Sequence, residues 1–203
     1  IPRNITSIPE MLFAYSGLQS VEIGYQIKSI GMAAFINCYN LTSVTFENYN
    51  SDTNKPQCTI IESLAFADCA KLSNLIIPES VNEFKDVNPF SSCYGLKNLE
   101  IYSKSETIIS HILHIMSLAT HLDCNQLTSL VLSYFPYYDV EFKQLVFPAL
   151  KNLTILSGDI AHNAFKGMNT LKTLTLAEGV TSLGQQAICH CYSLETLYIP
   201  STL

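Results

Sequence analysis

Apolar and polar residues alternate in a short string that recurs eight times along the chain, with the pattern Leu-x-x-(Val/Leu)-x-(Ile/Phe/Leu). Alternation with a period of two is typical of a short strand that buries one face. The strings begin at Leu18, Leu41, Leu72, Leu96, Leu127, Leu150, Leu171 and Leu194, so subtracting neighbours gives intervals of 23, 31, 24, 31, 23, 21 and 23 residues. We therefore predict strands near 19–24, 42–47, 73–78, 97–102, 128–133, 151–156, 172–177 and 195–200.

A second apolar pattern lies between the strings and keeps phase with them. Its best copy spans residues 27–38 and reads Ile-x-x-Ile-Gly-x-x-Ala-Phe-x-x-Cys, with further copies around Phe66, Phe90, Phe165 and Ile188. A single coil of this length cannot bury its apolar side alone, and stacked coils can. We expect the strands to align into one parallel sheet, while the Phe of each turn fills the wide part of its coil.

The two patterns together resemble the BspA-type, or Treponema-type, leucine-rich repeat. The resemblance covers residues 5 to 200, and Ile77-Pro78 and Ile199-Pro200 also match the Ile-Pro that follows the strand in this family. It implies a β-dominated leucine-rich repeat solenoid of the α/β class, a right-handed coil of about eight repeats of roughly 23 residues each. It also implies a surface or secreted protein that adheres to or binds other proteins, often host proteins, and it supplies no catalytic residues.

One of the two long intervals contains a segment with helical spacing. Apolar residues from Ile108 to Leu122 recur at that spacing, and Ser103 with Glu106 has the form of a capping box, which predicts an inserted helix near 104–122. His111, His114 and His121 fall on or near the polar side of this helix. Zinc ligands on a helix usually sit one turn apart and no carboxylate partners accompany these histidines, so we expect a solvated polar face and no metal.

Five of the seven cysteines share one register of the repeat: Cys38, Cys69, Cys93, Cys124 and Cys191. Met168 fills the same position in another copy, and no Cys-x-x-Cys pair exists. Because free cysteine behaves as a small hydrophobic residue, we expect buried, unpaired thiols with a structural role. A metal or redox role is the alternative interpretation.

Composition narrows the choice of partners. Hydrophobic residues make up 48% of the chain and charged residues 14%, enough apolar side chain to form a core. The net charge of -6 and the lack of a basic run argue against nucleic acid, and no apolar run is long enough to span a bilayer. Phosphate-binding loops and nucleophile motifs are missing, so we expect no cofactor and no enzyme activity.

Candidate ligand-binding residues lie on the open face of the predicted sheet. The positions two after each first leucine are all small and polar, whereas the positions four after vary. Variation on a constant frame favours ligand recognition, so Glu22, Glu100, Tyr102 and Tyr198 are the first candidates. The aromatic cluster Tyr134, Tyr137 and Tyr138 is the second. The alternative is that these tyrosines cover a core exposed by an irregular coil.

We expect residues 1–203 to form a single leucine-rich repeat solenoid domain, monomeric and part of a longer array or precursor. The predicted function is a non-enzymatic protein-binding module, adhesin-like and located outside the cell or on its surface. The alternative is an intracellular, cytoplasmic scaffold that binds a protein through the same solenoid.

Overall fold

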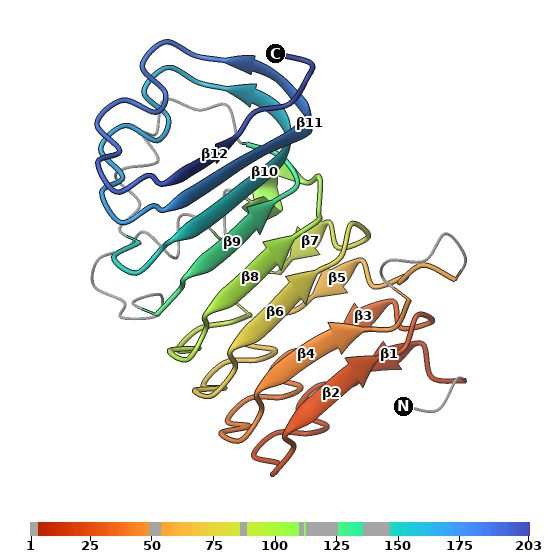
Figure 1. Cartoon of the computed structure of the whole chain (residues 1–203). Coiled ribbons are helices and arrows are strands. Elements are labelled where there is room, and N and C mark those ends of the chain that lie inside the picture. Colours follow the sequence, from red (N-terminus) through yellow and green to blue (C-terminus); the bar gives the residue numbers. More distant parts are fainter. Residues whose placement is uncertain (1–3, 49–53, 86–88, 110–111, 113–125, 136–146) are drawn as a thin grey trace.

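The main feature of the fold is an eight-stranded parallel sheet whose strands stack in chain order (Figure 1). A computed structural model describes residues 4–48, 54–85, 89–109, 112, 126–135 and 147–203. The strands are β2 (Ser20–Ile23), β4 (Ser43–Phe46), β6 (Asn74–Ile77), β8 (Asn98–Ile101), β9 (Ser129–Leu132), β10 (Asn152–Ile160), β11 (Thr173–Leu183) and β12 (Thr196–Tyr198). All eight predicted strands and their parallel pairing are confirmed.

A second, smaller parallel sheet accompanies the first, and the sequence pattern did not predict it. It is formed by β1 (Ser7–Ile8), β3 (Ser29–Ile30), β5 (Ile60–Ile61) and β7 (Glu83–Phe84), in that order. Two residues per strand are too few to give a periodic signal. Further along the chain, β10 and β11 are long strands, and Ile160 of β10 pairs with Leu183 of β11.

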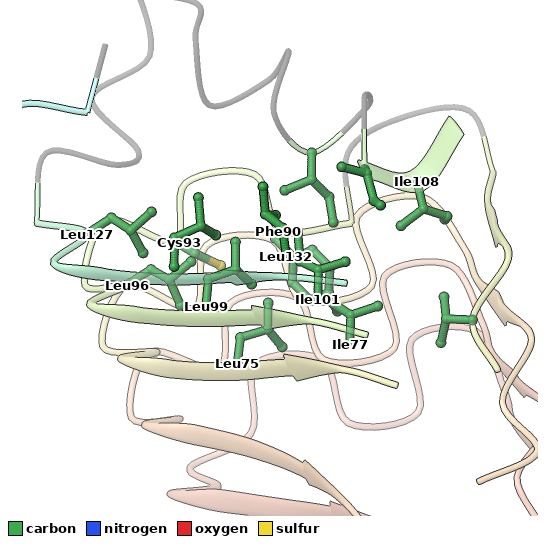
Figure 2. Close-up of a cluster of buried hydrophobic side chains, with 14 of the residues drawn as sticks. Leu75, Ile77, Phe90, Cys93, Leu96, Leu99, Ile101, Ile108, Leu127 and Leu132 are labelled. Atoms are coloured by element: carbon green, nitrogen blue, oxygen red, sulfur yellow. The ribbon is translucent and has the colours of Figure 1, made fainter. Parts of the chain in front are cut away.

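The core fills the space between the sheet and the turns. The inward residues of neighbouring strands are in register, so Leu75 pairs with Leu99 and Ile77 with Ile101. All four are at most 3% exposed. Figure 2 shows these side chains on one side of the strands, together with Phe90 and Cys93 from the turn. Stacking thus buries a face that one coil alone would leave in water.

Phenylalanines of successive turns form a stacked column within this core. Phe13 lies 5.1 Å from Phe35, Phe35 lies 5.0 Å from Phe66, and Phe66 lies 5.4 Å from Phe90, measured between ring centroids. Phe35 and Phe66 are fully buried. The prediction that the Phe of each turn fills the wide part of the coil is confirmed for these copies.

The turns that carry Phe13, Phe35 and Phe66 each place two residues in the left-handed region of backbone conformation. In one coil Ala33 and Asn37, two residues on either side of Phe35, have φ values of 53° and 60°. The amide of Phe35 then points to the next coil, where it donates to the carbonyl of Ala65 at 2.7 Å. The amide of Ala34 donates within its own coil, to Gly31 at 3.2 Å. Alternate amides therefore close the turn and join it to the following coil.

The inserted helix begins later than the capping box suggested. Residues 104 and 105 precede the helix, residues 106–109 and 112 are helical, and residues 110, 111 and 113–122 of the predicted range lie outside the described residues. The Ser105 carbonyl accepts the first intrahelical bond from the Ile109 amide, so Ser105 is the N-cap. The prediction for Ser103 is wrong, because its side chain is fully buried and its hydroxyl donates to the Val81 carbonyl at 2.5 Å. Among the described residues, no helix has the length and apolar character to cross a membrane.

Candidate protein-binding face

The outer side of the eight-stranded sheet carries the positions two and four after each first leucine, which we call the open face. The positions two after form one continuous row across the sheet, in register from Ser20 to Thr196. Within this row, the Asn98 side-chain amide donates to the Asn74 Oδ1 atom at 2.6 Å. The small polar residues thus form part of the constant frame of the sheet.

The positions four after form a second row, and its centre is half-buried. Glu100 pairs in register with Ile76 on one side and with Val131 on the other. The Tyr102 hydroxyl donates to the Glu100 Oε2 atom at 2.8 Å. The structure therefore joins two of the predicted ligand-binding residues into one unit between two aliphatic side chains.

Two other candidates lie far from this unit. Glu22 is on β2 and Tyr198 on β12, the two edge strands of the sheet. Tyr198 is 58% exposed. Much of this exposure comes from its edge position, since Leu197 is 38% exposed while Leu174, its partner on β11, is fully buried. Glu22 and Tyr198 therefore belong to opposite ends of the face.

The aromatic cluster is described only in part. Tyr134 packs against the core, and a Cβ atom on Gly158 would lie 2.9 Å from its Cδ2 atom. Gly158 has a φ of 99°, a conformation that glycine adopts without strain. Tyr134 thus covers the core beside β10, as the alternative interpretation expected for the cluster. Tyr137 and Tyr138 lie outside the described residues.

The cysteine column is a hydrogen-bonded part of the core. Cys38, Cys69 and Cys93 are buried, Cys191 is half-buried, and none of the six described cysteines forms a disulfide. Each of these four thiols donates to the carbonyl of the aligned Phe in the preceding coil, over 3.0–3.3 Å. Burial raises the pKa of the Cys69 thiol to about 12, which suits a structural group rather than a nucleophile. Cys124 lies outside the described residues.

Sequence reasoning missed a row of serine hydroxyls, of which Ser103 and Ser133 are buried and Ser157 is half-buried. The Ser133 hydroxyl donates to the Ser103 carbonyl, and the Ser157 hydroxyl donates to the Ser133 carbonyl at 2.6 Å. With the bond from Ser103 to Val81, these contacts link four successive coils. Ser103, Ser133 and Ser157 lie seven, six and seven residues after the first leucine of their respective repeats. No fixed spacing therefore distinguished them in the sequence.

A hollow of about 350 Å³ lies at the edge where β6 ends, and none of the candidate residues lines it. It is lined by Lys55, Pro56, Pro78, Glu79 and Ser80. Lys104 binds Glu79 at 2.7 Å, and this charged hydrogen bond holds the pKa of the Glu79 carboxyl below its usual range. Of the two charged residues that line the hollow, Glu79 is held in this exposed ion pair.

The described residues contain no group of three side chains suited to hold a metal ion. His162 accepts a hydrogen bond from the Gln185 amide at 2.8 Å, and His190 lies 2.8 Å from the Tyr192 hydroxyl. His111, His114 and His121 lie outside the described residues, so the absence of a metal there stays a prediction.

Stacked parallel-strand coils with an aliphatic core and one continuous open face define a leucine-rich repeat solenoid. The family model of the BspA type Leucine rich repeat region matches residues 6–141 and 132–203, in six copies. The chain belongs to this family. No curated protein is similar enough to the chain to count as a match.

Several solved structures are similar to the chain. They include the pneumococcal vaccine antigen PcpA, with 20% identity, a TM-score of 0.47, and coverage of 98% of this chain and 44% of that one. A leucine-rich repeat protein from Bacteroides ovatus has 17% identity and a TM-score of 0.47, with coverage of 100% and 60%. The T. pallidum leucine-rich repeat protein has 21% identity and a TM-score of 0.45, with coverage of 94% and 72%. The chain thus spans less than two thirds of the length of the first two proteins.

Proposed function

We propose that the chain is a non-enzymatic protein-binding module of a secreted or surface-exposed protein, with an adhesin-like role. The observation that carries this proposal is the open face itself. A constant row of small polar residues runs beside a row whose side chains change from strand to strand. A solenoid recognises a particular protein through such variable positions on a repeated frame.

The Glu100–Tyr102 unit is the proposed centre of the binding surface. A tyrosine offers a large contact area at a low entropic cost, and its bond to Glu100 fixes the ring before a partner arrives. Ile76 and Val131 add half-buried apolar area on either side. An apolar centre with polar surroundings is the usual anatomy of a protein interface. Glu22 and Tyr198 then extend contacts toward the two ends of the sheet.

Direct binding assays with purified proteins test this proposal. Immobilised chain is exposed in parallel to extracellular-matrix extract and to cytosolic extract of host cells, and every captured protein is purified and retested alone. We expect saturable binding of an extracellular protein. A cytosolic protein as the only direct binder would favour the intracellular scaffold, and no direct binder from either extract would contradict the proposal.

A further inference from the structure

Three lysines follow the edge of the open face where the strands begin. Lys97, Lys151 and Lys172 each stand immediately after the first leucine of their repeat, and all three are exposed. Their backbones are joined across the sheet. The Thr128 amide donates to the Lys97 carbonyl at 2.9 Å, the Lys151 amide to the Thr128 carbonyl at 3.0 Å, and the Lys172 amide to the Lys151 carbonyl at 2.8 Å. We call these three side chains the lysine edge.

The lysine edge concentrates positive charge in a chain whose net charge is -6. Neighbouring strands lie about 4.8 Å apart, so Lys151 adjoins Lys172 and Lys97 follows about 10 Å away. Like charges on adjacent strands repel one another. Lys172 is paired with Glu195 at 2.5 Å, whereas Lys97 and Lys151 form no ion pair with any described residue. Lys97 and Lys151 thus leave two exposed positive charges at this edge, with which an external anion can pair.

The apolar residues of the open face and the net charge of the chain favour one kind of anion over another. Lys97 directly precedes β8 and lies three residues before Glu100, so the lysine edge is about 10 Å along the strands from the half-buried Ile76 and Val131, which pair with Glu100. Apolar side chains of that kind are covered by a protein, not by a sulfated polysaccharide that is hydrophilic on all sides. The net charge of -6 also repels a long polyanion, whereas a short acidic segment meets only the local positive field.

We infer that the lysine edge docks a short acidic segment of the protein that binds the open face. The inference rests on the proposed function, because it assigns one rim of the same interface. Rim charges of this sort raise the association rate and fix the register of the partner. The contact is therefore sensitive to salt, as expected for exposed charges.

A labelled decaglutamate peptide tests the lysine edge without the natural partner. Its binding to the chain is measured by fluorescence anisotropy at low salt and at physiological salt. The triple variant K97Q/K151Q/K172Q should bind the peptide about tenfold more weakly, because each exposed charge contributes modestly. The matched control K28Q/K85Q/K166Q changes the net charge by the same amount and should bind within about twofold of the unchanged chain. Circular dichroism verifies that both variants are folded.

Three results would overturn the inference. Equal losses in the two triple variants would show that the peptide senses only net charge. Tighter binding of a sulfated oligosaccharide than of decaglutamate, lost in K97Q/K151Q/K172Q, would assign the lysine edge to a glycan. Binding of a purified partner protein to the unchanged chain, measured separately, distinguishes this test from the test of the proposed function. A chain that binds a protein through Tyr102 but ignores decaglutamate would refute only the lysine edge.

Discussion

A buried cysteine in this stack does more than fill space. The Cys69 thiol donates to the Phe35 carbonyl of the preceding coil at 3.3 Å, and Cys38 and Cys191 repeat the arrangement. An alanine at this position would leave that carbonyl without its thiol donor. The sequence register predicted burial of the thiols, but the hydrogen bond depends on where the preceding Phe carbonyl points, which spacing alone does not reveal.

The raised thiol pKa values predict loss of stability in alkali. Burial raises the pKa of Cys58 and of Cys69 to about 12. An unfolded thiol ionises near pH 8.5. Above that pH the unfolded chain loses protons that the folded chain keeps, so the free energy of unfolding falls as pH rises from about 8.5 to 12. Below about pH 8.5, both thiols stay protonated in the folded and the unfolded chain, so they should not make the free energy of unfolding depend on pH.

Urea denaturation at several pH values between 7 and 11 measures this effect. Cys69→Ala should reduce the steepness of the alkaline decline compared with the unchanged chain, although it is less stable at pH 7. Identical pH dependence in the two proteins would show that Cys69 titrates normally in the folded state.

The Phe column predicts a large cost for one truncation. Phe66 is fully buried and stacks on two neighbouring rings. Phe66→Ala should lower the free energy of unfolding by about 3–5 kcal/mol. Phe13→Ala, at the half-exposed start of the column, is the matched control and should cost clearly less. Urea midpoints of the two variants provide the comparison, and equal costs would mean that the column is not packed as described.

The strands and the helix of this fold differ in how clearly the sequence pattern predicts them. Each strand of the main sheet has three apolar positions and a constant frame, so all eight were predictable. The two-residue strands β1, β3, β5 and β7 depend on hydrogen bonds between coils, which leave no period in the sequence. The N-cap was misplaced because Ser103 and Ser105 are both serines, and only burial shows that Ser103 bonds to another coil.

Substitution of glycine tests how closely two neighbouring coils approach each other. A Cβ atom on Gly31 would lie 2.7 Å from the Glu10 amide nitrogen and 2.8 Å from the Ile8 carbonyl oxygen, both backbone atoms of the preceding coil. Gly31→Ala should therefore destabilise the chain by about 1–3 kcal/mol. Gly17→Ala places its Cβ in open space and should change stability by less than about 1 kcal/mol. Thermal or urea unfolding measures both, and a neutral Gly31→Ala would contradict the close approach of these coils.

At the scale of the whole molecule, stacking converts eight short strings into one surface. Because every strand pairs with its neighbour in register, residues about 30 positions apart in sequence, such as Glu100 and Val131, become neighbours on the open face. The sequence therefore predicted which residues share the face. It did not predict which of them touch, since the bond from Tyr102 to Glu100 depends on side-chain conformations. Nor did it separate Glu22 and Tyr198, at the two edges, from the central unit.

The affinity of a purified partner for two matched double variants tests the central claim most directly. Glu100→Ala with Tyr102→Ala removes the centre of the open face, whereas Tyr39→Ala with Tyr94→Ala removes two exposed tyrosines of the turns. The first variant should weaken binding by about 1–4 kcal/mol, as interface anchors do. The second should bind as the unchanged chain does. Equal affinity of the first variant, in protein shown to be folded, would contradict the open face as the binding surface.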